Sequence, residues 1–189
     1  MEKSPVPMKP LTALLVVISL AGAQATELVP VSFREAVAEA TLIVRGHVTD
    51  VRGISLPTGV ESAVTVAVDS VLKGQADDFI SVRVPGGTIG RYRYVFVGAP
   101  TFAVNDQAVF LLRRGHDNAL RIVGLSQGLF TIRAVPGAGQ VLAAPVVAPQ
   151  TAATGQVVRG DGLRRMLPVS EFESLVKLVM AGQPQGGHQ

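Results

Sequence analysis

The feature that most constrains the fold is a succession of short segments in which apolar and polar residues alternate. From Leu42 to Val147, segments of this kind follow one another, separated by turn signals rich in Gly, Pro, Asn and Asp. Alternation with a period of two is typical of strands that bury one face, and about eight such strands at this spacing favour an all-β sandwich or barrel. We therefore expect a mainly β domain of about seven to eight short antiparallel strands.

The first two expected strands, residues 42–51 and 64–72, change their apolar register near their ends, at Val51 and Val71. Because a shift of one residue turns a side chain to the other face of a sheet, these changes predict β-bulges or bends. A loop containing Gly and Pro, residues 53–59, separates the two strands.

Residues 108–112 are apolar on both faces, which predicts a central, buried strand. The other expected strands cover residues 80–84, 92–97, 120–125, 129–135 and 141–147.

Two capped helices are expected to flank the strands. The pattern Ser-x-x-Glu occurs at Ser32–Glu35 and at Ser170–Glu173, and apolar residues at helical spacing follow each of them. In such a capping box each side chain satisfies a free backbone amide of the other residue. We predict helices over residues 32–41 and 170–181, the second ended by Gly182.

The N-terminus has the pattern of a secretory signal peptide. Lys3 and Lys9 precede a mostly apolar run from Leu11, and the small residues Ala23 and Ala25 form an A-x-A cleavage site. We therefore expect an exported protein, periplasmic or extracellular, with no stable membrane anchor after cleavage. An uncleaved anchor is the alternative, and Met8 is an alternative start.

Three regions follow from these patterns. Residues 1–25 are the expected signal peptide, residues 26–182 a single β-rich domain, and residues 183–189 a disordered tail. Within the domain, residues 148–168 are rich in Pro, Thr, Ala and Gly and are expected to form a loop.

Composition excludes several kinds of function. The chain has no cysteine, which excludes a disulfide framework, a catalytic thiol and an N-terminal lipid attached through Cys. Its net charge is +3, and cleavage would remove two positive charges and one negative, leaving +2. No basic block marks a nucleic-acid or membrane surface. We expect no nucleic acid as partner.

No catalytic or metal-binding motif stands out. His47 lies on the polar face of its expected strand, and His116 lies in a turn, so surface and turn roles explain both. Neither a zinc-type histidine spacing nor a Gly-x-Ser-x-Gly elbow occurs. We predict no cofactor and no metal. A secreted hydrolase with dispersed catalytic residues, drawn from His47, His116 and Asp106, stays as an alternative.

The most suggestive surface feature is Arg91-Tyr92-Arg93-Tyr94. Arginine beside an aromatic ring can bind anions or single strands, so these four residues are the candidate ligand-binding site. In a strand the two arginines share one face and the two tyrosines the other. The competing interpretation therefore places the tyrosines in the core and the arginines in solvent.

Three stretches carry a resemblance to known families. A capped helix leads into residues 40–48, residues 64–74 end in Lys73-Gly74, and residues 98–112 contain Gly-x-Pro-x-Phe before Asp106. This order is similar to the OB-like fold of netrin-type modules and tissue inhibitors of metalloproteinases. It also resembles a group of uncharacterised exported bacterial proteins, in which Gly124 to Phe130 would be a further shared element. The resemblance covers roughly residues 32–135.

The resemblance implies an OB-like barrel, but not the inhibitory mechanism, because those inhibitors chelate zinc through an N-terminal cysteine that this chain lacks. We therefore expect an exported binding or accessory module with an unknown protein partner, associated with an exported protease or the cell envelope. The alternatives are the secreted hydrolase and an OB-type binder of polyanions or single-stranded nucleic acid.

Export can be tested by N-terminal sequencing of the protein recovered outside the cytoplasm. The expected result is a mature chain that starts at Thr26 or Gln24, since cleavage follows the small residues of the A-x-A site. An intact Met1 or Met8 in the cytosol would contradict the prediction.

Overall fold

The computed structural model describes residues 31–135, 139–143 and 166–182. Several predictions fall outside the described residues: the signal peptide 1–25 with Ala23 and Ala25, the tail 183–189, and residues 144–165, which include most of the predicted 148–168 loop.

The described part of the chain is mainly β, as the alternation predicts. It contains the strands β1 (Leu42–Leu56), β2 (Gly59–Lys73), β3 (Phe79–Pro85), β4 (Gly87–Ile89), β5 (Tyr92–Tyr94), β6 (Gln107–Arg114), β7 (Leu120–Ile122), β8 (Leu129–Val135), β9 (Gly139–Ala143) and β10 (Leu167–Pro168). Its helices are α1 (Phe33–Glu39) and α2 (Val169–Ala181). Neither helix has the length and apolar character that a bilayer span requires.

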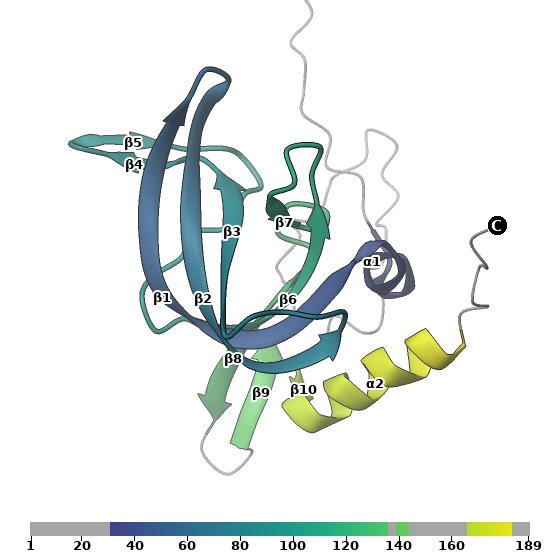
Figure 1. Cartoon of the computed structure of the whole chain (residues 1–189). Helices are drawn as coiled ribbons and strands as arrows, with labels where there is room; N and C mark the ends of the chain where they lie inside the picture. Colours follow the sequence, from purple (N-terminus) through teal and green to yellow (C-terminus); the bar gives the residue numbers. More distant parts are fainter. Residues whose placement is uncertain (1–30, 136–138, 144–165, 183–189) are drawn as a thin grey trace, which may run out of the picture.

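Five strands form a barrel-like ring (Figure 1). The order is β1-β2-β3-β7-β6, and β6 pairs back with β1 through six residue pairs. The ring is only loosely held between β3 and β7, which share two parallel pairs, Val82 with Leu120 and Arg83 with Arg121. All other pairings within the sheet are antiparallel. The prediction of a mainly β fold with short flanking helices is confirmed, and of the two predicted arrangements, a barrel or a β-sandwich, the strands form a barrel-like ring.

The interior of the ring is filled by side chains from all five strands. These residues are Leu42, Val44, Val48, Val64, Val66, Ile80, Val82, Val84, Ala108, Phe110, Leu112, Leu120 and Ile122. On β1 the inward residues are those that the alternation placed on one face. Burying each large apolar side chain stabilises the fold by about 1.5–3 kcal/mol.

A second apolar cluster lies between the outside of the barrel and the two helices. Phe33 of α1, Phe172 of α2 and Phe130 of β8 meet there, with ring centroids 4.7–6.1 Å apart. β6 contributes Val109 and Leu111 to this cluster, while its alternate residues line the barrel. The prediction of a central strand buried on both faces is confirmed.

The predicted β-bulges lie close to the expected positions. Val48 pairs with Val66 and Asp50 with Thr65, so Thr49 is an extra residue on β1 just before Val51. On β2 the residue left over is Leu72, beside Val71, because Ile43 and Val44 of β1 pair with Lys73 and Val71. Bulges of this kind bend a long strand, as a barrel of few strands requires.

The predicted loop over residues 53–59 is wrong. β1 and β2 run on through this region as one long hairpin, and only two residues, Pro57 and Thr58, connect them. Gly53, which suggested a loop, lies inside β1. A Cβ at this position would overlap the carbonyl oxygen of Thr88, so the glycine admits a neighbouring backbone.

The first capping box is confirmed and the second is wrong. The Ser32 side chain accepts a hydrogen bond from the Glu35 amide, and Glu35 accepts one from the Ser32 amide. α2 begins one residue earlier than predicted, because Leu167–Pro168 forms β10 at the end of the expected loop. Pro168 is its N-cap, without a side-chain cap, and Glu173 instead pairs with Arg45 at 3.2 Å. Gly182 ends α2 as predicted.

Lys73 and Gly74 join the end of β2 to helix α1. The Lys73 Nζ donates hydrogen bonds to the carbonyl oxygens of Val37 at 2.7 Å and Ala38 at 3.3 Å, and partial burial lowers the pKa of this amine. Gly74 has a φ of +81°, and a Cβ there would lie 2.6 Å from the Thr41 carbonyl oxygen. The Lys-Gly pair that carries part of the family resemblance therefore has a structural role.

We predict that Gly74→Ala lowers the free energy of unfolding by about 2 kcal/mol or more, since left-handed backbone costs an alanine about 1–2 kcal/mol and the clash with Thr41 adds to it. Gly90→Ala is the matched control: Gly90 also has positive φ, at +56°, but open space surrounds it. Urea unfolding of both variants measures the difference, and equal losses would contradict the assigned contact.

Candidate binding site

The β4–β5 hairpin projects from one side of the barrel, away from the two helices (Figure 1). Ile89 pairs with Tyr92, so Gly90 and Arg91 form a two-residue connection. The positive φ of Gly90 suits the first central position of a type II′ turn, which matches the twist of a hairpin. The structure thus has a tight, projecting hairpin where the alternation of apolar and polar residues predicted only a turn and a strand.

Close backbone contacts hold the base of the hairpin against the barrel. Gly53 of β1 admits the carbonyl oxygen of Thr88, and at the open end of the hairpin itself a Cβ at Gly86 would lie 2.7 Å from the Tyr94 carbonyl oxygen. The Ser62 hydroxyl donates a hydrogen bond to the Gly86 carbonyl oxygen at 3.0 Å. These contacts require small residues, and they fix where β5 and its continuation lie.

Residues 91–97, here called the exposed segment, present apolar side chains to solvent. Tyr92 and Tyr94 are 56% and 48% exposed, and Phe96 is 47% exposed. Val95 and Val97 reach 77% and 80%. The interpretation that buried the tyrosines in the core is therefore wrong. The physical reason is that β5 belongs to a separate two-stranded sheet, which has no core beneath it.

The predicted strand over residues 92–97 is correct only in its first half. β5 ends at Tyr94 because its partner β4 offers three residues, Gly87–Ile89. Beyond that point the structure gives the segment one backbone hydrogen bond to a described residue, from the Ala99 amide to the Phe96 carbonyl oxygen.

The charges of the exposed segment are uncompensated among the described residues. Arg91 lies over the ring of Tyr92, 5.1 Å from its centroid, and donates a hydrogen bond to the Tyr92 hydroxyl at 2.9 Å. No ion pair within the described chain includes Arg91 or Arg93. The sequence contains no Asp or Glu between Asp78 and Asp106. This stretch of the chain is therefore both apolar and cationic.

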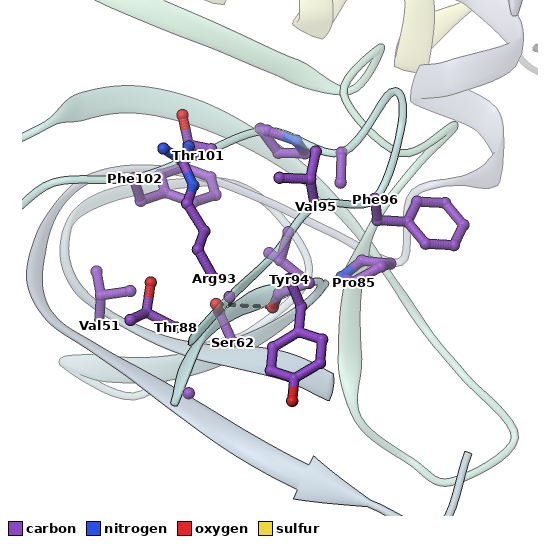
Figure 2. Close-up of a pocket in the computed structure, with 16 residues that line it drawn as sticks. Val51, Ser62, Pro85, Thr88, Arg93, Tyr94, Val95, Phe96, Thr101 and Phe102 are labelled. Carbon is purple, nitrogen blue, oxygen red and sulfur yellow. Dashed lines mark hydrogen bonds between the residues drawn. The ribbon is translucent and has the colours of Figure 1, made fainter. Parts of the chain in front are cut away.

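A pocket of about 360 Å³ lies between the exposed segment and the barrel (Figure 2). Apolar groups line most of it, among them Val51, Val95 and Phe102, and Ser62, Thr88 and Thr101 add hydroxyls. The side chain of Arg93 runs across the pocket toward Thr101 and Phe102 (Figure 2). Its lining suits a group that combines an apolar body with a negative charge.

Phe102 and Asp106 shape the segment that closes the far side of the pocket. The ring of Phe102 stacks on Phe110 inside the barrel, with centroids 6.0 Å apart. Asp106 accepts a hydrogen bond from the Ala103 amide at 2.7 Å, and its carbonyl oxygen accepts one from the Val48 amide. The stretch from Gly98 to Asp106, which carries part of the family resemblance, therefore positions the pocket wall. The carboxylate of Asp106 stabilises a turn within it.

The structure does not bring the two candidate histidines together. His47 is half-exposed, and its Nδ1 lies 3.2 Å from an oxygen of Asp69. It pairs with Gln107 at the start of β6, whereas His116 lies in the exposed turn after β6 ends at Arg114. At about 3.3 Å per residue the two sites are on the order of 20 Å apart along the strand. Among the described residues no three potential metal-binding side chains gather.

A second polar cluster, which the sequence did not indicate, surrounds Arg121. Its guanidinium donates hydrogen bonds to Glu61 at 2.7 Å and to Asp117 at 2.9 Å. The bond to Glu61 raises the pKa of Arg121, and the bond from Arg121 lowers the pKa of Asp117. A neighbouring pocket of about 310 Å³ is lined by Arg83, Arg113 and Arg121. Each of these arginines has a carboxylate partner, so the cluster is neutralised internally.

Comparison of the sequence with protein-family models and with curated proteins found no match. The geometry of the exposed segment is therefore the basis on which a function can be proposed.

We predict that the pocket binds 8-anilinonaphthalene-1-sulfonate, a dye with an apolar body and one negative charge. Arg93→Glu should weaken this binding about tenfold, which corresponds to about 1.4 kcal/mol, because it replaces the cation in the pocket with an anion. Titration by dye fluorescence measures the effect. Arg133→Glu is the matched control, since Arg133 is exposed on β8. An equal loss in both variants would contradict the assignment of the pocket.

Proposed function

We propose that this chain is an exported binding module that docks a protein partner through the exposed segment. The signal-like N-terminus supports export. The observation that carries the binding role is the run of exposed residues from Arg91 to Val97, in which five aromatic and aliphatic side chains accompany two arginines without carboxylate partners among the described residues. Aromatic residues and arginine are enriched at the centres of protein interfaces.

The hairpin geometry supports recognition rather than folding as the role of these side chains. None of the residues from Gly87 to Val97 belongs to either apolar cluster of the described structure. Exposed apolar groups of this kind cost solubility and do not stabilise the barrel. A partner that covers them would remove their contact with water, which is the main driving force for protein association.

The alternative of a secreted hydrolase lacks a constellation of groups to support it. A nucleophile, a base and an orienting group have to lie within hydrogen-bond reach of one another. His47 on β1 pairs with Asp69 on β2, His116 lies beyond the far end of β6, and Asp106 caps a turn. These contacts support surface and structural roles for the three residues.

A binder of polyanions is favoured by one specific observation, the exposure of Arg91, Tyr92, Arg93 and Tyr94 together. Exposed rings and cations can stack with bases and contact phosphates. Such binding would weaken steeply with salt, because it releases counterions. Binding of single-stranded DNA that persists at physiological salt and falls on Arg91→Glu would favour this alternative over a protein partner.

The proposed function is tested by placing a photo-crosslinking amino acid at Phe96 in the producing cells. We expect a discrete adduct with a protein, since Phe96 lies within the proposed interface. Leu178 is the matched control position, because it is 71% exposed but lies on α2. The same adducts from both positions, or none from Phe96, would contradict the proposal.

A further inference from the structure

The outer edge of β5 is open. β5 pairs on one side with β4, and β4 in turn lies against β1 at Gly53. Among the described residues no strand pairs with the other side of β5. In an antiparallel ladder successive residues direct their N–H and C=O groups to opposite sides, so some of the backbone groups of β5 point away from β4.

The chain beyond β5 continues this open edge. Val95, Phe96 and Val97 are aromatic or β-branched, which are residue types enriched in strands. Their one backbone hydrogen bond to a described residue is the bond from Ala99 to Phe96. A segment with high strand propensity, unpaired backbone and no proline is a template for pairing with another chain.

The charge of this edge selects among possible partners. Arg91 precedes it and Arg93 lies within it, and no acidic residue occurs between Asp78 and Asp106 in the sequence. The pocket beside the edge combines the cation of Arg93 with apolar walls from Val95 and Phe102. An acidic side chain carried on an extended apolar backbone would meet both features.

We infer that the edge formed by β5 and residues 95–97 binds an extended, acidic segment of a partner protein as an added strand. The inference rests on the proposed function and names the chemistry of its partner. Main-chain hydrogen bonds to β5 and its continuation supply affinity, as in other cases of strand addition. Alternate side chains of the added strand face the pocket, where Arg93 selects carboxylates.

A lipid surface fits this edge less well than a peptide. The aromatic and arginine side chains would suit a membrane interface. Hydrocarbon, however, cannot satisfy those N–H and C=O groups of residues 95–97 that have no partner among the described residues. A peptide strand pairs these groups directly.

A second copy of the chain fits less well because of its charge. Edge-to-edge pairing of two exposed segments would bring four arginines together, two from each copy. Neither copy has a carboxylate between Asp78 and Asp106 to compensate them. Like charges facing each other across paired strands are destabilising.

The test is a selection of displayed random ten-residue peptides on the full chain, with counter-selection on the double variant Arg91→Glu/Arg93→Glu. We expect enriched peptides to combine Asp or Glu with β-branched residues. Fluorescence anisotropy of a labelled selected peptide should show at least tenfold weaker binding to the double variant. Arg34→Glu/Arg133→Glu is the matched control, since both arginines are exposed and lie on α1 and β8, and it should bind like the wild type.

N-methylation of the selected peptide distinguishes strand addition from binding by side chains alone. The methyl groups are placed in two phases, on the odd-numbered or on the even-numbered backbone nitrogens. One phase should abolish binding and the other should leave the affinity within about threefold of the unmethylated peptide, because successive N–H groups point to opposite sides. Equal effects of both phases, or no enrichment over the control selection, would overturn the inference.

Two further measurements identify other occupants of the edge. Cosedimentation with phosphatidylglycerol vesicles, lost in the Arg91→Glu/Arg93→Glu variant, would overturn the inference in favour of a membrane. Dimerisation in analytical ultracentrifugation, lost on Val95→Lys, would overturn it in favour of a second copy. If Phe96 crosslinks to a protein but the selected peptides fail the N-methylation test, the proposed function stands and only strand addition falls.

Discussion

The burial of β6 on both faces is the constraint on which the rest of the structure depends. Ala108, Phe110 and Leu112 point into the barrel, while Val109 and Leu111 point toward the helices. One strand therefore joins two apolar clusters that would each be small alone. Because β6 also pairs with β1, β7 and β8, its position determines how the ring closes and where α1 and α2 pack. A polar residue at any of these five positions would lose burial in one of the two clusters.

Much of the barrel could be predicted from the sequence because its strands obey the alternation that burial on one face imposes. The bulges near Val51 and Val71 could be predicted for the same reason. A bulge shifts which residues face the core, so the alternation of apolar and polar residues changes at that point of the sequence. The capping box at Ser32 was also predictable, since both of its bonds are local. The box at Ser170 failed because a long-range pairing, β10 with β9, starts the helix one residue earlier.

The candidate site was predictable only in part. Arg91 to Tyr94 stood out as an unusual combination, but alternation cannot tell whether a strand lies over a core. The hairpin leaves the barrel, so both faces of β5 are exposed, and the exposed run extends to Val97. The available signals were glycines: Gly53 inside an otherwise regular strand and Gly86 before the hairpin both mark close backbone approaches. The approach of Thr88 to Gly53 joins residues far apart in the sequence, and no local pattern reveals it.

The β4–β5 hairpin has a consequence for how proteins with this barrel can diverge. Its closest contacts with the barrel include the approach of the Thr88 backbone to Gly53 and the hydrogen bond from Ser62 to the Gly86 carbonyl oxygen, and its side chains belong to neither apolar cluster in the described structure. Substitution of the side chains between Arg91 and Val97 would therefore remove nothing from either apolar cluster. Projecting connections of this kind tolerate changes of sequence better than the elements that form a core.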